Sequence, residues 1–187
     1  MFIQTEFTPN PLTLKFIPGV QITENAPVSF VKKDDAITSP LAQNLFEIGE
    51  VTGVFFGSDF ITITKTEGSD WELLKPQILL TIMEYLNSGR PIFNANSAVN
   101  TKNIINDEDS ELVKEIKELK ELIETRVRPA VAMDGGDIIF KGFEDGIVKL
   151  ELHGSCSGCP SSTITLKNGI ENMLKHYIPE IVAVEAV

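Results

Sequence analysis

Cysteine is scarce in this chain. Its 187 residues include two cysteines, which lie together as Cys156-Ser157-Gly158-Cys159. A metal ion or cluster that is held by cysteine sulfur usually takes four ligands. One chain supplies two thiolates, so such a site needs other residues or a second chain to complete it. The same pair could instead act as a redox dithiol, and the rest of the sequence has to distinguish these cases.

Positive charge is also in short supply. Lys and Arg total 16 against 27 Asp and Glu, which gives a formal net charge of −11 and a pI near 4.6. An acidic surface repels phosphate backbones and anionic lipids, so we expect neither a nucleic-acid partner nor a membrane partner. No apolar run approaches the roughly 18 residues that a membrane-spanning helix needs.

The first residues lack the features of a targeting segment. Met1-Phe2-Ile3-Gln4-Thr5-Glu6 has no basic flank followed by an apolar core, and it is not rich in arginine. We therefore expect a cytoplasmic, bacterial protein, and a mature mitochondrial protein whose presequence has been removed would fit the same sequence. In such a reducing compartment a CxxC pair more often serves metal or redox chemistry than a structural disulfide.

Two catalytic patterns are also missing from the sequence. There is no glycine-rich loop of the kind that cradles phosphates, and no Ser/His/Asp set. Asp134 and Asp137 could pair for acid–base work or for a metal. However, Gly135 and Gly136 separate them, and that pattern is typical of a turn that leads into a strand. We therefore expect a protein that is not an enzyme.

The periodicity of apolar residues predicts an α+β chain of two small α/β sandwich domains. The first covers residues 1–90 and the second covers residues 110–187. Between them, residues 91–109 are rich in asparagine and hold few large apolar side chains, which favours a flexible linker. For the first domain we predict strands over 12–16, 51–56 and 60–64, and helices over 41–48 and 71–86.

The second domain is predicted to follow the order αββαβ. Its first helix covers about 111–126, and Asp145-Gly146 joins two strands, 138–141 and 147–152. The second helix begins at Pro160, because proline is tolerated in a first turn, and a last strand covers 181–184. The predicted buried face of this second helix consists of Leu166, Ile170, Met173 and Tyr177.

The cysteine pair falls between the end of a predicted strand and the start of a predicted helix. Unpaired backbone N–H groups at a helix N-terminus carry the positive end of the helix dipole, and they favour thiolate over thiol. Gly154 and Gly158 allow the backbone to approach sulfur closely. These features suit any site for anionic sulfur, so they do not identify the metal.

Four interpretations of the pair are open at this point. Two cysteines that merely pack in a turn would not need glycine on both sides. A thiol–disulfide oxidoreductase usually carries its CxxC near a βαβ unit, whereas here the pair follows an antiparallel hairpin. A zinc site could add His153, in the spacing His-x-x-Cys-x-x-Cys. We favour a cluster shared by two chains, because two protomers on a twofold axis supply the four thiolates that a 4Fe-4S cluster takes.

Several motifs give the chain a family resemblance. In order and spacing, those of the second domain resemble the C-terminal domain of NifU-like (Nfu) proteins. They are Arg128-Pro129, Asp134-Gly135-Gly136-Asp137, Phe143-Glu144-Asp145-Gly146, the runs 154–162 and 165–171, and Tyr177-Ile178-Pro179-Glu180. The first domain resembles the Nfu N-terminal domain, so the resemblance covers nearly the whole chain. Its motifs are Thr8-Pro9-Asn10-Pro11, Lys15-Phe16, Val54-Phe55-Phe56-Gly57, Asp59-Phe60-Ile61-Thr62 and the run 71–76.

The resemblance implies an iron–sulfur cluster scaffold or carrier. It assigns a 4Fe-4S cluster, shared by the two chains of a homodimer, to Cys156 and Cys159. The implied partners are upstream cluster donor proteins and client apoproteins that receive the cluster. Full-length NifU proteins also carry a further scaffold domain and a ferredoxin-like domain with more cysteines. Since this chain has no cysteine for either, the resemblance favours carriage and delivery over primary assembly.

Overall fold

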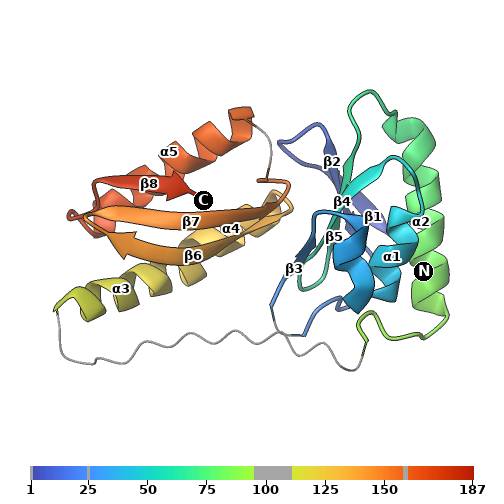
Figure 1. The fold of residues 1–187 in the computed structure, drawn as a ribbon, viewed down its shortest axis with the longest axis horizontal. Coiled ribbons are helices and arrows are strands. Elements are labelled where there is room, and N and C mark those ends of the chain that lie inside the picture. The colour runs from blue at the N-terminus through green and yellow to red at the C-terminus, as the bar shows by residue number, and fades with distance from the viewer. Residues whose placement is uncertain (1, 25, 95–110, 158–159) are drawn as a thin grey trace. The chain divides into compact units, whose positions relative to one another are not determined.

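The α+β class and the two-domain organisation predicted from the sequence are confirmed (Figure 1). The computed structural model describes residues 2–24, 26–94, 111–157 and 160–187. The chain divides into two compact units, Met1–Val99 and Asn100–Val187. The predicted linker, residues 91–109, lies mostly outside the described residues, so its flexibility stays a prediction. At its start, Ile92 and Phe93 pack against the core of the first unit.

The first unit is built on a five-stranded antiparallel sheet with the strand order β1-β2-β5-β4-β3. Its central strands match the predicted ones to within one residue. Leu14, Val54 and Ile63 are neighbours across three of these strands, and each is at most 2% exposed. The strands are β1 (Gln4–Phe7), β2 (Thr13–Ile17), β3 (Val28–Phe30), β4 (Val51–Phe56) and β5 (Ile61–Lys65).

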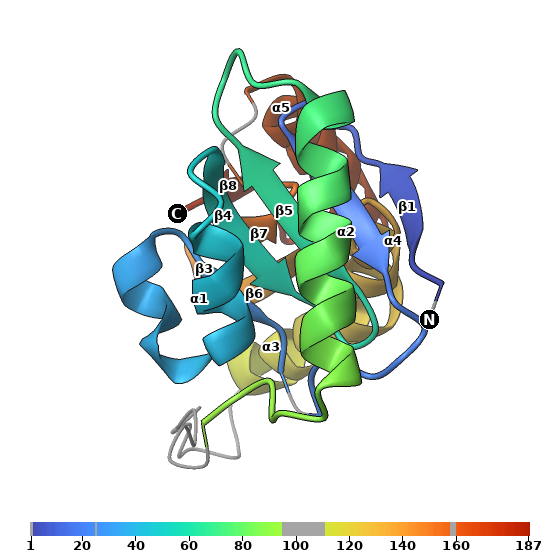
Figure 2. The same cartoon turned by 90° about the vertical axis from the view of Figure 1, so that its right-hand side faces the viewer.

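Two helices, α1 (Pro40–Phe46) and α2 (Trp71–Asn87), lie together on one face of this sheet (Figure 2). Helix α1 begins where the Oγ of Ser39 accepts a hydrogen bond from the N–H of Ala42, with proline in the first turn. Asp70 caps α2 in the same way. Both starts agree with the prediction, because capping residues are local signals.

The second unit confirms the predicted order αββαβ. Its sheet has the order β6-β7-β8, with β6 and β7 antiparallel and β7 and β8 parallel. The turn between β6 and β7 places both Asp145 (φ 50°) and Gly146 (φ 76°) in the left-handed region, as predicted for Asp-Gly. Its elements are α3 (Glu111–Leu122), a π turn (Ile123–Val127), α4 (Arg128–Met133), β6 (Gly136–Glu144), β7 (Ile147–Gly154), α5 (Pro160–Tyr177) and β8 (Ala183–Ala186).

The predicted end of the first helix near residue 126 is wrong. The helical chain continues through a π turn, Ile123–Val127, into α4, which ends at Met133. In the π turn the N–H of Arg128 donates to the carbonyl of Ile123, five residues earlier. This wider turn precedes Pro129, which lacks an N–H and whose ring would crowd a regular α-turn. The helix therefore passes the proline instead of stopping before it.

The predicted buried face of the last helix is wrong at Tyr177, and Leu166 is among the residues whose side chains the structure does not describe. Tyr177 is 49% exposed, whereas Leu174, which the prediction omitted, is fully buried. The buried stripe runs through Ile170 and Leu174 to Ile178, in steps of four residues. It packs against residues on one face of the sheet, among them Val148 and Leu150. The last strand begins at Ala183, two residues later than predicted.

Among the described residues, no helix is long and apolar enough to cross a membrane.

Substitutions on α2 test which face of this helix carries the core. Ile78→Ala should lower the free energy of unfolding of the first unit by about 2–4 kcal/mol, because Ile78 is fully buried. Leu80→Ala, on the same helix but 51% exposed, should change it by less than about 1 kcal/mol. Urea denaturation of the full chain measures both. Equal losses in the two variants would contradict the packing described here.

Candidate functional site

The first cysteine of the pair lies in the turn that joins β7 to α5. Cys156 is 4% exposed and belongs to the core of the second unit. Gly158 and Cys159 lie outside the described residues, so the position of the second sulfur stays a prediction. Helix α5 begins at Pro160, directly after the pair, as the sequence predicts.

Two glycines allow the chain to fold tightly at this point. Gly136, the first residue of β6, is the register partner of Gly154, the last residue of β7. A Cβ on Gly136 would lie 2.5 Å from the Sγ of Cys156 and 2.8 Å from the carbonyl oxygen of His153. Gly154 has φ +66°, a conformation that favours glycine. The sulfur therefore packs against bare backbone, which only glycine at position 136 permits.

Two hydrogen bonds from Ser155 hold the turn after β7 to the segment that precedes β6. Its N–H donates to the carbonyl of Gly135 at 3.2 Å, and its hydroxyl donates to the carbonyl of Asp134. The same hydroxyl oxygen lies 3.8 Å from the Sγ of Cys156. One residue further on, the N–H of Ser157 donates to the carbonyl of Gly154 at 3.1 Å. The backbone on both sides of Cys156 is thus held by hydrogen bonds.

The expectation that this turn favours a thiolate is wrong for Cys156. The pKa of the Cys156 thiol is raised to about 11, chiefly by burial; the hydrogen bond with Ser155 opposes this shift, and the negative charges of Asp134 and Asp137 add to it. Burial is the largest of these causes, because it removes water from the charged form of the sulfur. At neutral pH the structure therefore holds Cys156 as a protonated, covered thiol.

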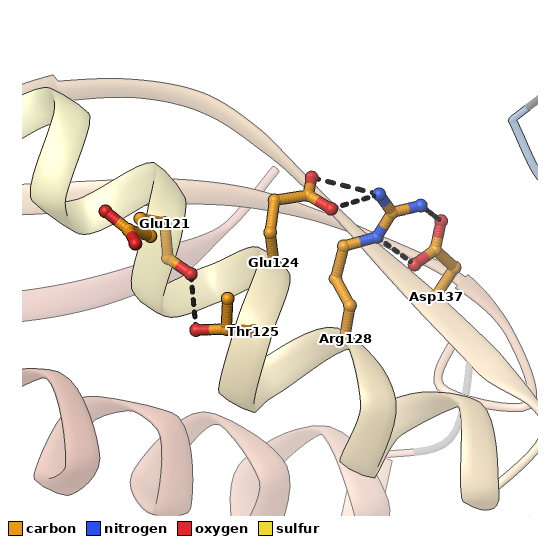
Figure 3. A network of polar contacts seen from close by, with 5 residues as sticks. All are labelled: Glu121, Glu124, Thr125, Arg128 and Asp137. Atoms are coloured by element: carbon orange, nitrogen blue, oxygen red, sulfur yellow. Dashed lines mark hydrogen bonds and ion pairs between the residues drawn. The ribbon is translucent and has the colours of Figure 1, made fainter.

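A charged network lies where β6 begins (Figure 3). Arg128 donates from Nε and Nη2 to the two carboxylate oxygens of Asp137, both at 2.8 Å. Its Nη1 donates to both carboxylate oxygens of Glu124, at 2.9 and 2.8 Å. The hydrogen bonds with Asp137 are the main cause that raises the pKa of Arg128 above its usual value.

The network decides between the two interpretations of Asp134 and Asp137. Asp137 is 5% exposed, and Arg128 takes up both of its carboxylate oxygens, so it does not form an acid–base pair with Asp134. The interpretation of this segment as a turn leading into a strand is confirmed, since β6 begins at Gly136. The ion pair itself could not be predicted from the sequence, because no spacing rule joins a helical arginine to a carboxylate on the following strand.

The spacing His-x-x-Cys-x-x-Cys makes His153 a candidate third metal ligand. Its Nε2 lies 3.4 Å from Oε1 of Glu151, and within the described residues this nitrogen is buried and makes no hydrogen bond. In the part of the chain that the structure describes, which omits Cys159, no three His, Cys, Asp or Glu side chains gather as a metal-binding group. The zinc alternative requires Cys159, which lies outside the described residues, so it stays a prediction.

Comparison with known proteins gives matches along nearly the whole chain. The family described as "Scaffold protein Nfu/NifU N terminal" matches residues 3–89, and the family described as "NifU-like domain" matches residues 119–185. A human protein named "NFU1 iron-sulfur cluster scaffold homolog, mitochondrial" is 54% identical over 188 aligned positions, which cover 100% of this chain and 72% of that protein.

Two further matches come from a fly and from a yeast. The Drosophila sechellia protein of the same name is 51% identical over 100% of this chain and 65% of its own length. The chain thus spans about two thirds of the length of these curated relatives. The solution NMR structure of a NifU-like protein from Saccharomyces cerevisiae is 28% identical, with a TM-score of 0.46, over 51% of this chain and 86% of that one.

Substitution of Gly136 tests the contact between sulfur and backbone. Gly136→Ala should lower the free energy of unfolding of the second unit by about 1–3 kcal/mol, because the new methyl group meets both a side chain and a backbone carbonyl. Gly142→Ala on the same strand is the matched control, since a Cβ there has no heavy atom within 4 Å. Chemical denaturation of the apo chain compares them, and a loss no larger in the first variant would contradict the contact.

The protonation of Cys156 can be measured in a Cys159→Ala variant, in which Cys156 is the only cysteine. The rate of alkylation by iodoacetamide should rise about tenfold per pH unit between about pH 8 and pH 10, because the thiolate is the nucleophile and the thiol has a pKa of about 11. In denaturant the rise should end near the ordinary pKa of about 8.5. A native profile that levels off at or below about pH 9 would show that burial does not control this thiol.

Proposed function

This chain belongs to the NifU-like (Nfu) family of iron–sulfur cluster scaffold proteins, and from that premise we propose that it carries a 4Fe-4S cluster between two protomers and delivers it to apoproteins. The cluster is cargo in this account, bound for a time and then passed on. Its proposed ligands are Cys156 and Cys159 of each chain.

The observation that carries the proposal is the number and place of the cysteines. The chain has two, three positions apart in the sequence, and both precede Pro160, the first residue of α5. A 4Fe-4S cluster takes four thiolates, and a twofold axis that brings two such pairs together supplies that number with no other residue needed. A site formed in this way lies at a junction between two chains, so separation of the chains exposes the cluster to a recipient.

The environment of Cys156 suits a ligand that is covered until cargo arrives. Iron binds the thiolate, so loading must remove the proton of a thiol whose pKa is about 11. Ligation by iron supplies the positive charge that makes this proton loss favourable. We propose that the turn 154–157 opens as the cluster binds, because Cys156 is 4% exposed in the structure described here. Until then the covered thiol is protected from oxidation.

The alternative function, a thiol–disulfide oxidoreductase, fits these properties poorly. The attacking cysteine of such an enzyme is exposed and has a lowered pKa. Cys156 is buried, and its pKa is raised. This contrast, together with the scaffold names of the relatives, leads us to propose a carrier that is not an enzyme.

The partners and the compartment follow from the carrier role. We propose that upstream cluster donors load the protein and that client apoproteins unload it, with residues 91–109 as a flexible linker between domain 1–90 and domain 110–187. The curated relatives are named as mitochondrial proteins. Thiol ligation requires a reducing compartment, and the bacterial cytoplasm and the mitochondrial matrix both provide one.

Anaerobic reconstitution with iron and sulfide tests the proposed function. The loaded protein should contain about two iron and two sulfide per chain, since four of each are shared by two chains. Cys156→Ala and Cys159→Ala should each abolish loading, while the far-ultraviolet circular dichroism of the apo chains should stay that of the unaltered protein. A single variant that still assembles a full cluster, or an unaltered chain that binds zinc and no iron, would contradict the proposal.

A further inference from the structure

Two uncharged stretches of sequence border the cysteine turn of the second unit. Residues 129–133 and residues 154–166 contain no Asp, Glu, Lys or Arg, although 23% of the whole chain is charged. Helix α4 ends at Met133, β7 ends at Gly154 and α5 begins at Pro160. Hydrogen bonds from the turn to the segment between α4 and β6 hold these ends together (Figure 1). The turn therefore lies at an end of the second unit that carries almost no charge.

Large apolar side chains are exposed at this end. Met133, the last residue of α4, is 76% exposed, and Ile164, in the second turn of α5, is 62% exposed. Pro129 and Ala130 are also exposed, and helical spacing puts them on the same face of α4 as Met133. Single exposed apolar residues are common on protein surfaces. Here, however, they stand on both of the helices that border the turn, and together these four residues are the apolar rim.

The opposite end of the second unit has a different character. The turn between β6 and β7 carries Asp145, the loop after α5 carries Glu180, and both residues are exposed. Val182 lies beside this turn, since its N–H donates to the carbonyl of Gly146, and it is 65% exposed. A second chain with a net charge of −11 meets like charges at this end. At the cysteine end it meets almost none.

We propose that the apolar rim is the contact surface between the two protomers of the cluster-loaded dimer, with Met133 and Ile164 of each chain packed against the partner. The inference rests on the proposed function, because half a cluster site per chain requires a second copy at this turn. Two copies of an acidic chain pack closely only where both are uncharged, and the apolar rim is such a place. A basic partner would instead be drawn to the acidic surface elsewhere. A twofold axis through the cluster brings the same surface of both chains together.

The small size of the apolar rim makes the contact depend on the cluster. A stable interface buries about 800 Å² on each partner, and four side chains supply only part of that area. We therefore expect the apo chain to stay monomeric. In the loaded dimer the apolar contact adds to the bonds between iron and sulfur, so removal of the cluster separates the chains.

Carboxylates placed on the apolar rim test the proposal. Met133→Glu and Ile164→Glu each put a charge into the contact twice, once per chain, so the loaded dimer should dissociate at protein concentrations at least about tenfold higher than the unaltered one. Val182→Glu is the matched control at the opposite end and should shift this midpoint by less than about twofold. Met133→Leu keeps the apolar volume and should match the unaltered chain. Anaerobic sedimentation of the reconstituted full-length proteins over a dilution series measures each midpoint.

Photo-crosslinking gives a second measurement that does not depend on tight association. Ile164→p-benzoylphenylalanine should link the two chains of the loaded protein, whereas Val182→p-benzoylphenylalanine should not, and neither should link apo chains. If Met133→Glu and Ile164→Glu take up no cluster, this comparison decides. Crosslinked dimers from the first substitution alone support the contact, and equal yields from both overturn it.

The remaining outcomes overturn the inference. Loaded Met133→Glu and Ile164→Glu dimers that dissociate at the same concentration as the Val182→Glu dimer would show that the apolar rim is not at the contact. Variants that keep the dimer but slow transfer of the cluster to an apoprotein would assign the apolar rim to a recipient. An unaltered chain that takes up no cluster, or that carries a complete cluster as a monomer, overturns the proposed function itself.

Discussion

The packing of one sulfur atom against one glycine organises the second unit. Cys156 lies where the β6–β7 hairpin opens, and its Sγ occupies the space that a Cβ on Gly136 would fill. For the sulfur to reach this place, Gly154 must adopt a positive φ and Ser155 must bond to the Asp134–Gly135 carbonyls. The hairpin and the turn are therefore fixed together around the thiol.

The burial of Cys156 opposes the deprotonation that binding of iron requires. The contacts that place Cys156 also remove it from water, so they favour the thiol, whereas iron requires the thiolate. A permanent metal centre would gain nothing from such a ligand. A carrier would gain from it, because a buried thiol is protected from oxidation while no cluster is bound. Reprotonation of the thiolate also favours release of the cluster.

Features of the fold that depend on residues close in the sequence could be predicted, and features that depend on contacts between distant residues could not. Helix α2 and strand β4 follow from local apolar periodicity and capping, and so does the Asp145-Gly146 turn, whose positive φ is a local property. The passage of the helix beyond Pro129 was not predictable, because it depends on a π turn that no periodicity marks. The CxxC motif located the site, but the raised pKa of Cys156 results from tertiary burial. The Arg128–Asp137 pair likewise joins residues that only the folded chain brings together.

The central claim is that one chain holds half of a cluster site. Native mass spectrometry of the anaerobically loaded protein tests it most directly, because it weighs the assembly and its cargo together. The account predicts a species of two chains with four iron and four sulfide, and bare monomers after the cluster is removed. A monomer that carries a complete 4Fe-4S cluster would contradict it.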